Sequence, residues 1–201
     1  MTRTRSIALS LSVLSLAAAV ATGCGGSSND GFRGAGSKID GDPTTTLPTD
    51  LAASKAPPVK PAGPLPTQTN ITGVSTDLSK KPKVPAATGA APTVLQASDV
   101  VPGSGPAAKS GDKVSVQYVG TLFNGGKQFD ASWDRGKKPF QFTLGQGQVI
   151  AGWDNGVAGM KVGGRRVLVI PADQAYGANG SPPTIPANAP LVFVVDLKKI
   201  G

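Results

Sequence analysis

The chain has 201 residues, a formal net charge of +8, 27 Gly, 18 Pro, a single Cys and no His. Without His the chain cannot assemble a Ser-His-Asp or Cys-His nucleophile, and one Cys alone cannot build a structural zinc site. We therefore expect no metal site and no cofactor, and a chemistry that rests on Asp, Tyr, Trp, amide groups and shape.

The positive charge is spread along the chain. Clusters such as Lys80-Lys81-Pro82-Lys83 and Arg165-Arg166 are short, and neither contains an aromatic residue. Faces that bind nucleic acids combine denser charge with aromatic side chains. The charge pattern favours a solvated surface, and we expect no nucleic-acid partner.

Residues 1–23 have the pattern of a targeting segment. Arg3 and Arg5 precede an apolar stretch from Ile7 to Val20 that is broken only by Ser, and small residues follow. This order is typical of a secretory signal peptide. The apolar stretch is shorter than a transmembrane helix ordinarily requires.

The only cysteine comes directly after this segment. Ala21-Thr22-Gly23-Cys24 resembles the lipobox of bacterial lipoprotein precursors, in which the signal is cut before Cys and the Cys is acylated. The alternative is an ordinary secretory signal that happens to contain a Cys, but a lone thiol cannot form an internal disulfide. We expect lipid attachment at Cys24, and hence an extracytoplasmic lipoprotein on the periplasmic or cell-surface side of a membrane.

Residues 24–91 differ in composition from the rest of the chain. From Gly25 to Ala91 the sequence holds nine Pro and nine Gly, and its only aromatic residue is Phe32. No helical or strand periodicity persists for more than a few residues, so this segment cannot bury enough apolar surface to offset chain entropy. We predict a disordered, partly polyproline tether, and the alternative is a second small domain.

Residues 92–201 show the patterns of a folded domain. Short β-rich or alternating runs predict five strands, at residues 93–96, 113–119, 140–144, 165–170 and 191–197. Asn124-Gly125-Gly126 predicts a hairpin turn, because Asn-Gly accepts the positive φ angles that such a turn needs.

One short helix is expected over residues 149–158. Ile150, Trp153 and Val157 fall on one stripe of this helix. The fold class is therefore α+β, with a mostly antiparallel sheet of about five strands wrapped around one short helix and preceded by a disordered linker.

The aromatic residues gather in this domain. Nine of the ten lie between Tyr118 and Phe193, and several fall at inward positions of different elements. A plain hydrophobic core is the simple interpretation. However, buried Tyr and Trp need partners for their polar atoms, and Asp130 and Asp134 flank the cluster. A half-open aromatic pocket with a polar rim is the usual form of a small-ligand site.

Many short strings of the domain occur in an order and spacing that together are typical of one family. They are Val116-Gln117-Tyr118-Val119-Gly120, Phe129-Asp130-Ala131-Ser132, Pro139-Phe140-Gln141-Phe142, Leu144-Gly145, Val149-Ile150-Ala151-Gly152-Trp153, Gly156-Val157, Met160-Lys161-Val162-Gly163, Ala175-Tyr176-Gly177, Ile185-Pro186 and Leu191-Val192-Phe193. The domain thus resembles the FKBP-type peptidyl-prolyl cis-trans isomerases. This resemblance implies an antiparallel sheet wrapped on a short helix, in agreement with the expected fold class.

The resemblance also implies roles for single residues. Trp153 would form the floor of the pocket beneath the substrate proline ring. The Ile150 backbone amide and the Tyr176 hydroxyl would donate hydrogen bonds to substrate carbonyls. The remaining walls, polar side and overhanging loop would be formed by Tyr118, Phe140, Val149, Phe193, Phe129, Asp130, Arg135 and Ile185.

This chemistry suits a chain without His. Rotating a prolyl amide breaks its resonance against a barrier of about 18–20 kcal/mol and requires no nucleophile. A dry aromatic pocket favours the twisted, less polar amide over the planar one.

We therefore expect a monomeric isomerase (rotamase) that assists the folding of exported proteins, with proline-containing polypeptides as substrates and macrolides as inhibitors. The alternative is a proline-segment binding or chaperone module of the same fold without turnover. A non-enzymatic structural lipoprotein is a third interpretation.

Overall fold

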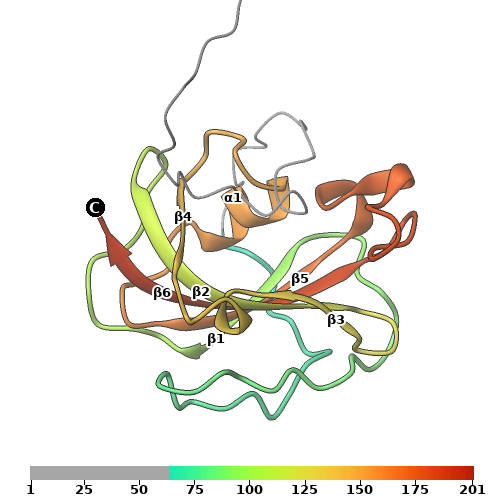
Figure 1. The fold of residues 1–201 in the computed structure, drawn as a ribbon, viewed down its shortest axis with the longest axis horizontal. Coiled ribbons are helices and arrows are strands. Elements are labelled where there is room, and N and C mark those ends of the chain that lie inside the picture. The colour runs from blue at the N-terminus through green and yellow to red at the C-terminus, as the bar shows by residue number, and fades with distance from the viewer. Residues whose placement is uncertain (1–63) are drawn as a thin grey trace, which may run out of the picture. The chain divides into compact units, whose positions relative to one another are not determined.

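The computed structural model describes residues 64–201, and the predictions for residues 1–63, including the signal, Cys24 and the first part of the tether, lie outside it. In the described part, six antiparallel strands form one sheet (Figure 1). They are β1 (Gln96–Val101), β2 (Lys113–Leu122), β3 (Gln128–Ala131), β4 (Phe140–Thr143), β5 (Arg165–Ile170) and β6 (Leu191–Ile200).

The strand order is β1-β5-β6-β2-β3, and β4 pairs with the first half of β2. One edge of β2 pairs with β6, while β4 and then β3 pair with its other edge. The long strand β2 therefore links the two short strands on which several predicted site residues lie.

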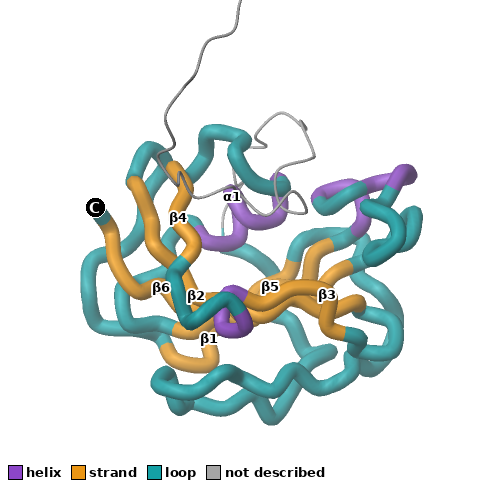
Figure 2. The backbone as a smooth tube through the Cα atoms, viewed as in Figure 1, coloured by secondary structure: helices purple, strands orange, loops and turns teal. Residues whose placement is uncertain are grey.

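A single α-helix, α1 (Ala151–Val157), packs on one face of this sheet in the described part of the chain (Figure 2). Its approach to β5 depends on Gly152, because a Cβ at this position would come 2.4 Å from Ile170 Cγ2. Three 3-10 helices complete the elements: η1 (Ser132–Asp134), η2 (Ala172–Gln174) and η3 (Gly177–Asn179).

The predicted fold class is confirmed, with differences at the level of single elements. Strand β3 was not expected, because its four residues have no alternation of their own and are defined by the hairpin with β2. Strand β1 starts at Gln96 and not at residue 93, since its pairing with β5 begins there. The helix starts only after Ile150, whose ψ of 147° is extended backbone.

The inner face of the sheet carries the main core, as the alternation predicts. Val114, Val116 and Tyr118 of β2 and Leu191, Phe193, Val195 and Leu197 of β6 belong to it, together with Trp153 of α1. The outer face is apolar as well. Val167 and Val169 of β5 and Val192 and Val194 of β6 form a second buried cluster there.

Residues 64–91, named the outer strap from here on, cover this outer face. Figure 1 shows most of the strap on the side of the sheet opposite α1, while Leu65 at its start packs against the main core on the inner face. Ile71 of the strap is 3% exposed and packs in the outer cluster, with Val74, Val84 and Ala87 against it. The interpretation of residues 64–91 as free tether is therefore wrong. The strap has no regular secondary structure, so its apolar side chains, which pack against the four valines, follow no helical or strand period.

Candidate active site

An aromatic cluster occupies the inner face of the sheet, with Trp153 at its centre. The indole is fully buried and contacts four other aromatic rings at centroid distances of 5.1 to 6.0 Å. These rings come from β2, β4 and β6 and are those of Tyr118, Phe193, Phe142 and Phe140. Four of the chain's elements thus meet at one apolar, largely edge-to-face cluster.

A polar group borders the cluster where β2 meets β3. The Tyr118 hydroxyl donates a hydrogen bond to Asp130, and Arg135 donates one to Asp130 and another, of 2.6 Å, to the Tyr118 hydroxyl. Burial and the hydrogen bond to Asp130 raise the pKa of Tyr118. The phenol therefore stays neutral at physiological pH, and its hydroxyl group remains the donor of the hydrogen bond to Asp130.

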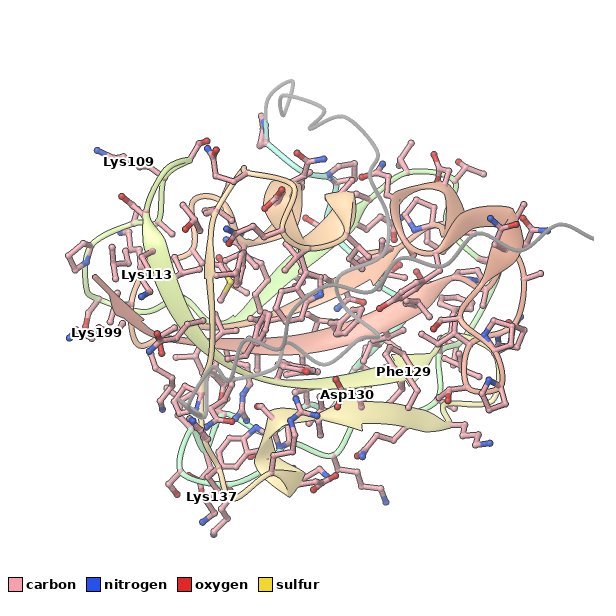
Figure 3. The ribbon with its side chains drawn as sticks, turned by 45° about the horizontal axis from the view of Figure 1, so that its top comes forward. Lys109, Lys113, Phe129, Asp130, Lys137 and Lys199 are labelled. Atoms are coloured by element: carbon pink, nitrogen blue, oxygen red, sulfur yellow. The ribbon has the colours of Figure 1, made fainter. Side chains whose placement is uncertain are left out.

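Phe129 extends the cluster along β3. Its ring meets Phe193 edge to face at a centroid distance of 5.5 Å. Figure 3 shows Phe129 beside Asp130 on the same strand. The side chain of Arg135 is 44% exposed and Phe129 is half-buried, so solvent reaches the cluster from this side.

The start of α1 brings a backbone donor to the cluster. Val149 and Ile150 are both buried in the main core. The Ile150 carbonyl accepts hydrogen bonds from the first turn of the helix, but no described residue accepts the Ile150 N–H. An N–H in this position is a donor that a carbonyl of a bound peptide can use.

Asp154 fixes the loop that leads to this donor. Its two carboxylate oxygens accept hydrogen bonds from the backbone N–H groups of Gly145 (2.8 Å) and Gly147 (2.9 Å). Burial raises the pKa of Asp154, although these two hydrogen bonds act in the opposite direction. Through its two hydrogen bonds, the Asp154 side chain holds the loop between β4 and Ile150 against the first turn of α1.

The segment after β5 supplies the remaining predicted residues. Tyr176, which precedes η3, is 6% exposed, and Ile185 is 1% exposed. Both belong to the main core cluster with Trp153. An antiparallel bridge between Ser181 and Ile185 shapes this loop.

Comparisons with known proteins agree on one family. The family model described as FKBP-type peptidyl-prolyl cis-trans isomerase matches residues 105–198. A "FK506-binding protein" of Streptomyces anulatus is 53% identical over 119 residues, which are 59% of this chain and 95% of that protein. The "Peptidyl-prolyl cis-trans isomerase Fkbp12" of Drosophila melanogaster is 50% identical over 107 residues, 53% of this chain and 97% of that protein.

A solved structure gives the same result. The crystal structure of AtFKBP13 superposes with a TM-score of 0.50 at 38% sequence identity, covering 55% of this chain and 96% of that chain. The chain belongs to the FKBP-type peptidyl-prolyl cis-trans isomerase family. It is an isomerase of this class, and the family binds proline-containing substrates and macrolides such as FK506.

The FKBP-type domain brings together all of the site residues expected from its sequence. Nine of them lie in the main core cluster or pack against it, and Asp130 and Arg135 lie at its polar border. Phe140 and Tyr176 are each 6% exposed, and the rings of Tyr118, Phe142 and Trp153 pack against Phe140.

Three further residues shape this site: Phe142, which the sequence places inward in the aromatic cluster without a site role, and Asp154 and Gly120, which the sequence does not predict. Phe142 stacks on Phe140 with an interplanar angle of 24°, and Asp154 holds the loop before Ile150. Gly120 allows two rings to meet, because a Cβ there would lie 2.7 Å from Phe193 and 2.8 Å from Phe129. The signals for them were present in the strings of the family resemblance, as Gly120 ends one string and Asp154 follows another.

Among residues 64–201, no group of three or more His, Cys, Asp or Glu side chains is placed to hold a metal ion. The chemistry of the site can be described with its aromatic rings, its hydroxyl groups and backbone donors.

Proposed function

We propose that this isomerase acts on proline-containing segments of exported proteins while acyl chains on Cys24 hold it on a membrane surface. The observation that carries the catalytic part is the buried Trp153, which is enclosed by aromatic rings near the Ile150 N–H, for which no residue from 64 to 201 is an acceptor. This arrangement combines an apolar floor for a proline ring with a donor for a peptide carbonyl.

Catalysis follows from what this cluster offers a twisted amide. The planar prolyl amide is more dipolar than the twisted one, so an apolar surrounding raises the planar form in free energy relative to the transition state. Lowering the barrier by about 5–8 kcal/mol would bring turnover into the ordinary range of enzymes. In this proposal, Trp153 and Phe193 bind the ring, and the Ile150 amide and the Tyr176 hydroxyl hold the substrate carbonyls.

The polar group at the border has a supporting role in this proposal. Arg135 and Asp130 bind the Tyr118 hydroxyl from two sides. This fixes the orientation of the Tyr118 ring, which meets both Trp153 and Phe140 edge to face. Residues Phe129, Val149 and Ile185 then complete the apolar surface on which a substrate lies.

The membrane attachment rests on the N-terminal sequence. The segment before Cys24 has the order of a secretory signal, and Cys24 follows small residues as in a lipobox. Residues 64–201 contain no helix that could span a membrane. Two or more acyl chains give stable anchoring where one does not, so acylation of both the thiol and the new amino group would suffice.

A binding module without turnover is the second candidate. A buried aromatic cluster can bind a proline-containing segment without accelerating its isomerisation. The segment between Gly177 and Pro186 is short, which leaves no room for an inserted chaperone domain and favours a simple monomeric catalyst.

The test of catalysis is cis-trans isomerisation of short Xaa-Pro peptides by the full chain, with FK506 as competitor. We expect turnover that FK506 abolishes. Peptide binding without any acceleration of isomerisation would favour the binding module.

The test of attachment is membrane fractionation of cells that express the full chain or Cys24→Ser. We expect the wild-type protein to stay with membranes after a salt wash and Cys24→Ser to be released. Retention of Cys24→Ser on salt-washed membranes would refute lipid anchoring.

A further inference from the structure

The outer strap is held on the sheet by a buried guanidinium. Arg165 is 0% exposed and binds the Asp196 carboxylate through Nε and Nη2. Its other donors reach the strap, with Nη1 bonded to the Ser75 carbonyl at 2.6 Å and Nη2 to the Lys80 carbonyl at 3.2 Å. Because a buried charge needs every one of these partners, the strap backbone is fixed at two points five residues apart.

Lys81 follows Lys80, the second strap residue bound by Arg165, and its side chain extends toward the border of the active site. Lys81 Nζ lies 2.7 Å and 2.8 Å from the two carboxylate oxygens of Asp134, the last residue of η1. Gln128 of β3 donates a further hydrogen bond of 2.9 Å to Asp134. The hydrogen bond from Lys81 is the main reason that the pKa of Asp134 is lowered.

The two ends of η1 are held differently. At its start, the Ser132 hydroxyl accepts the Tyr118 N–H at 2.9 Å and donates to the Gln117 side chain, so this end belongs to β2. At its end, Asp134 is held by Gln128 and by Lys81 of the strap. The next residue along the chain is Arg135, which binds Tyr118 and Asp130 at the border of the aromatic cluster.

We propose that Lys81 is a positioning residue of this isomerase, which holds Asp134 and thereby fixes Arg135 at the polar border of the site. The strap lies before the segment that the family model matches, residues 105–198. The brace therefore lies outside the segment that the family model matches. The proposal rests on the isomerase activity, and its first test is independent of that activity.

The first test measures backbone hydrogen exchange at Arg135, whose N–H donates to the Ser132 carbonyl at 3.1 Å. The full chain is compared as wild type, as Lys81→Met, which keeps the apolar stem, and as Lys83→Met. Lys83 lies on the same strap, is exposed, and forms no ion pair with any of the described residues. We expect about two- to fivefold faster exchange at Arg135 in Lys81→Met only, in keeping with a pair that is partly exposed.

The second test uses the isomerase assay with the same three proteins. Lys81→Met should lower kcat/KM by about two- to fivefold, mainly through KM, while Lys83→Met stays at the wild-type value. Lys81→Arg keeps the cation and should restore the value. In an Asp134→Asn background, Lys81→Met should cause no further loss, because the partner is already gone.

Salt separates this role from a general loss of stability. The Lys81 and Asp134 side chains are 36% and 52% exposed, so salt screens their attraction. Wild-type kcat/KM should fall toward that of Lys81→Met as salt rises, while the variant changes little. Equal exchange at Arg135 in Lys81→Met and Lys83→Met would overturn the proposal, even if the chain proved inactive. A loss of activity that Lys81→Arg does not restore would overturn it as well.

Discussion

The Tyr118 hydroxyl donates its hydrogen bond to the Asp130 carboxylate and is neutral when it does so. Arg135 donates a hydrogen bond to the same hydroxyl, so the hydroxyl oxygen is the acceptor for Arg135 while its proton points to Asp130. The Tyr118 hydroxyl therefore keeps its proton near neutral pH and joins the side chains of Asp130 and Arg135 in one hydrogen-bonded group at the border of the site.

The first prediction concerns pH. Burial and Asp130 raise the pKa of Tyr118, and the chain has no His, so the charge of the site should not change between about pH 6 and 8. We expect kcat/KM on an Xaa-Pro peptide to be flat over this range. A bell-shaped profile centred near pH 7 in folded protein would show that a proton transfer takes part.

The second prediction concerns Gly120. Adding a methyl group there places it 2.7 Å from Phe193 and 2.8 Å from Phe129, and neither ring is the far end of a flexible side chain. We expect Gly120→Ala to cost about 1–3 kcal/mol of stability and to lower kcat/KM, because the edge-to-face pair must separate. Urea unfolding and the peptide assay measure the two effects. Wild-type values in both would mean that the two rings do not define the site.

The third prediction uses the raised pKa of Asp154. Because the folded state binds a proton at Asp154 more readily than the unfolded chain does, the contribution of this group is largest below its ordinary pKa of 3.8 and is lost as pH rises through the raised value. Relative to Asp154→Asn, the wild-type protein should therefore gain stability as pH falls from neutrality toward about 4. Thermal midpoints of both proteins across this range test the sign. A difference that grows with rising pH would contradict it.

The fourth prediction concerns the start of the folding unit. A chain of residues 92–201 lacks the outer strap, which exposes four valines of β5 and β6 and leaves Arg165 without the two strap carbonyls. Burying one Val or Ile side chain is worth about 1.5–3 kcal/mol. We expect residues 92–201 to unfold at a clearly lower urea concentration than residues 64–201. Equal urea midpoints would show that the contacts of the strap with the sheet do not stabilise the folded domain.

The sheet and the aromatic cluster can be predicted from the sequence, because both depend on short-range patterns of residues. Val114, Val116 and Tyr118 alternate strictly, and this alternation alone places them on the inner face. The roles of single site residues are implied by the family resemblance, and the structure places Ile150 and Tyr176 together in the main core cluster.

The outer strap was missed because it makes no regular element that a period could reveal. A signal did exist in the strands, since Val167 and Val169 in β5 and Val192 and Val194 in β6 make the outer face as apolar as the inner one. Strands that are apolar on both faces are buried on both. The pair of Lys81 and Asp134 joins positions 53 residues apart, and no local pattern predicts such a contact.

The most direct test of the central claim, that a desolvated aromatic cluster performs the catalysis, is the isomerase activity of a Phe140→Ala, Phe193→Ala double variant. Its control is Phe123→Ala, which removes a buried ring from the outer cluster and not from the site. Each Phe→Ala change costs about 3–5 kcal/mol, so activity is measured only on protein shown to be folded.

The account predicts that the folded double variant loses most of its turnover while folded Phe123→Ala keeps the wild-type rate. Undiminished activity in a folded double variant would contradict the account and return these rings to a purely structural role.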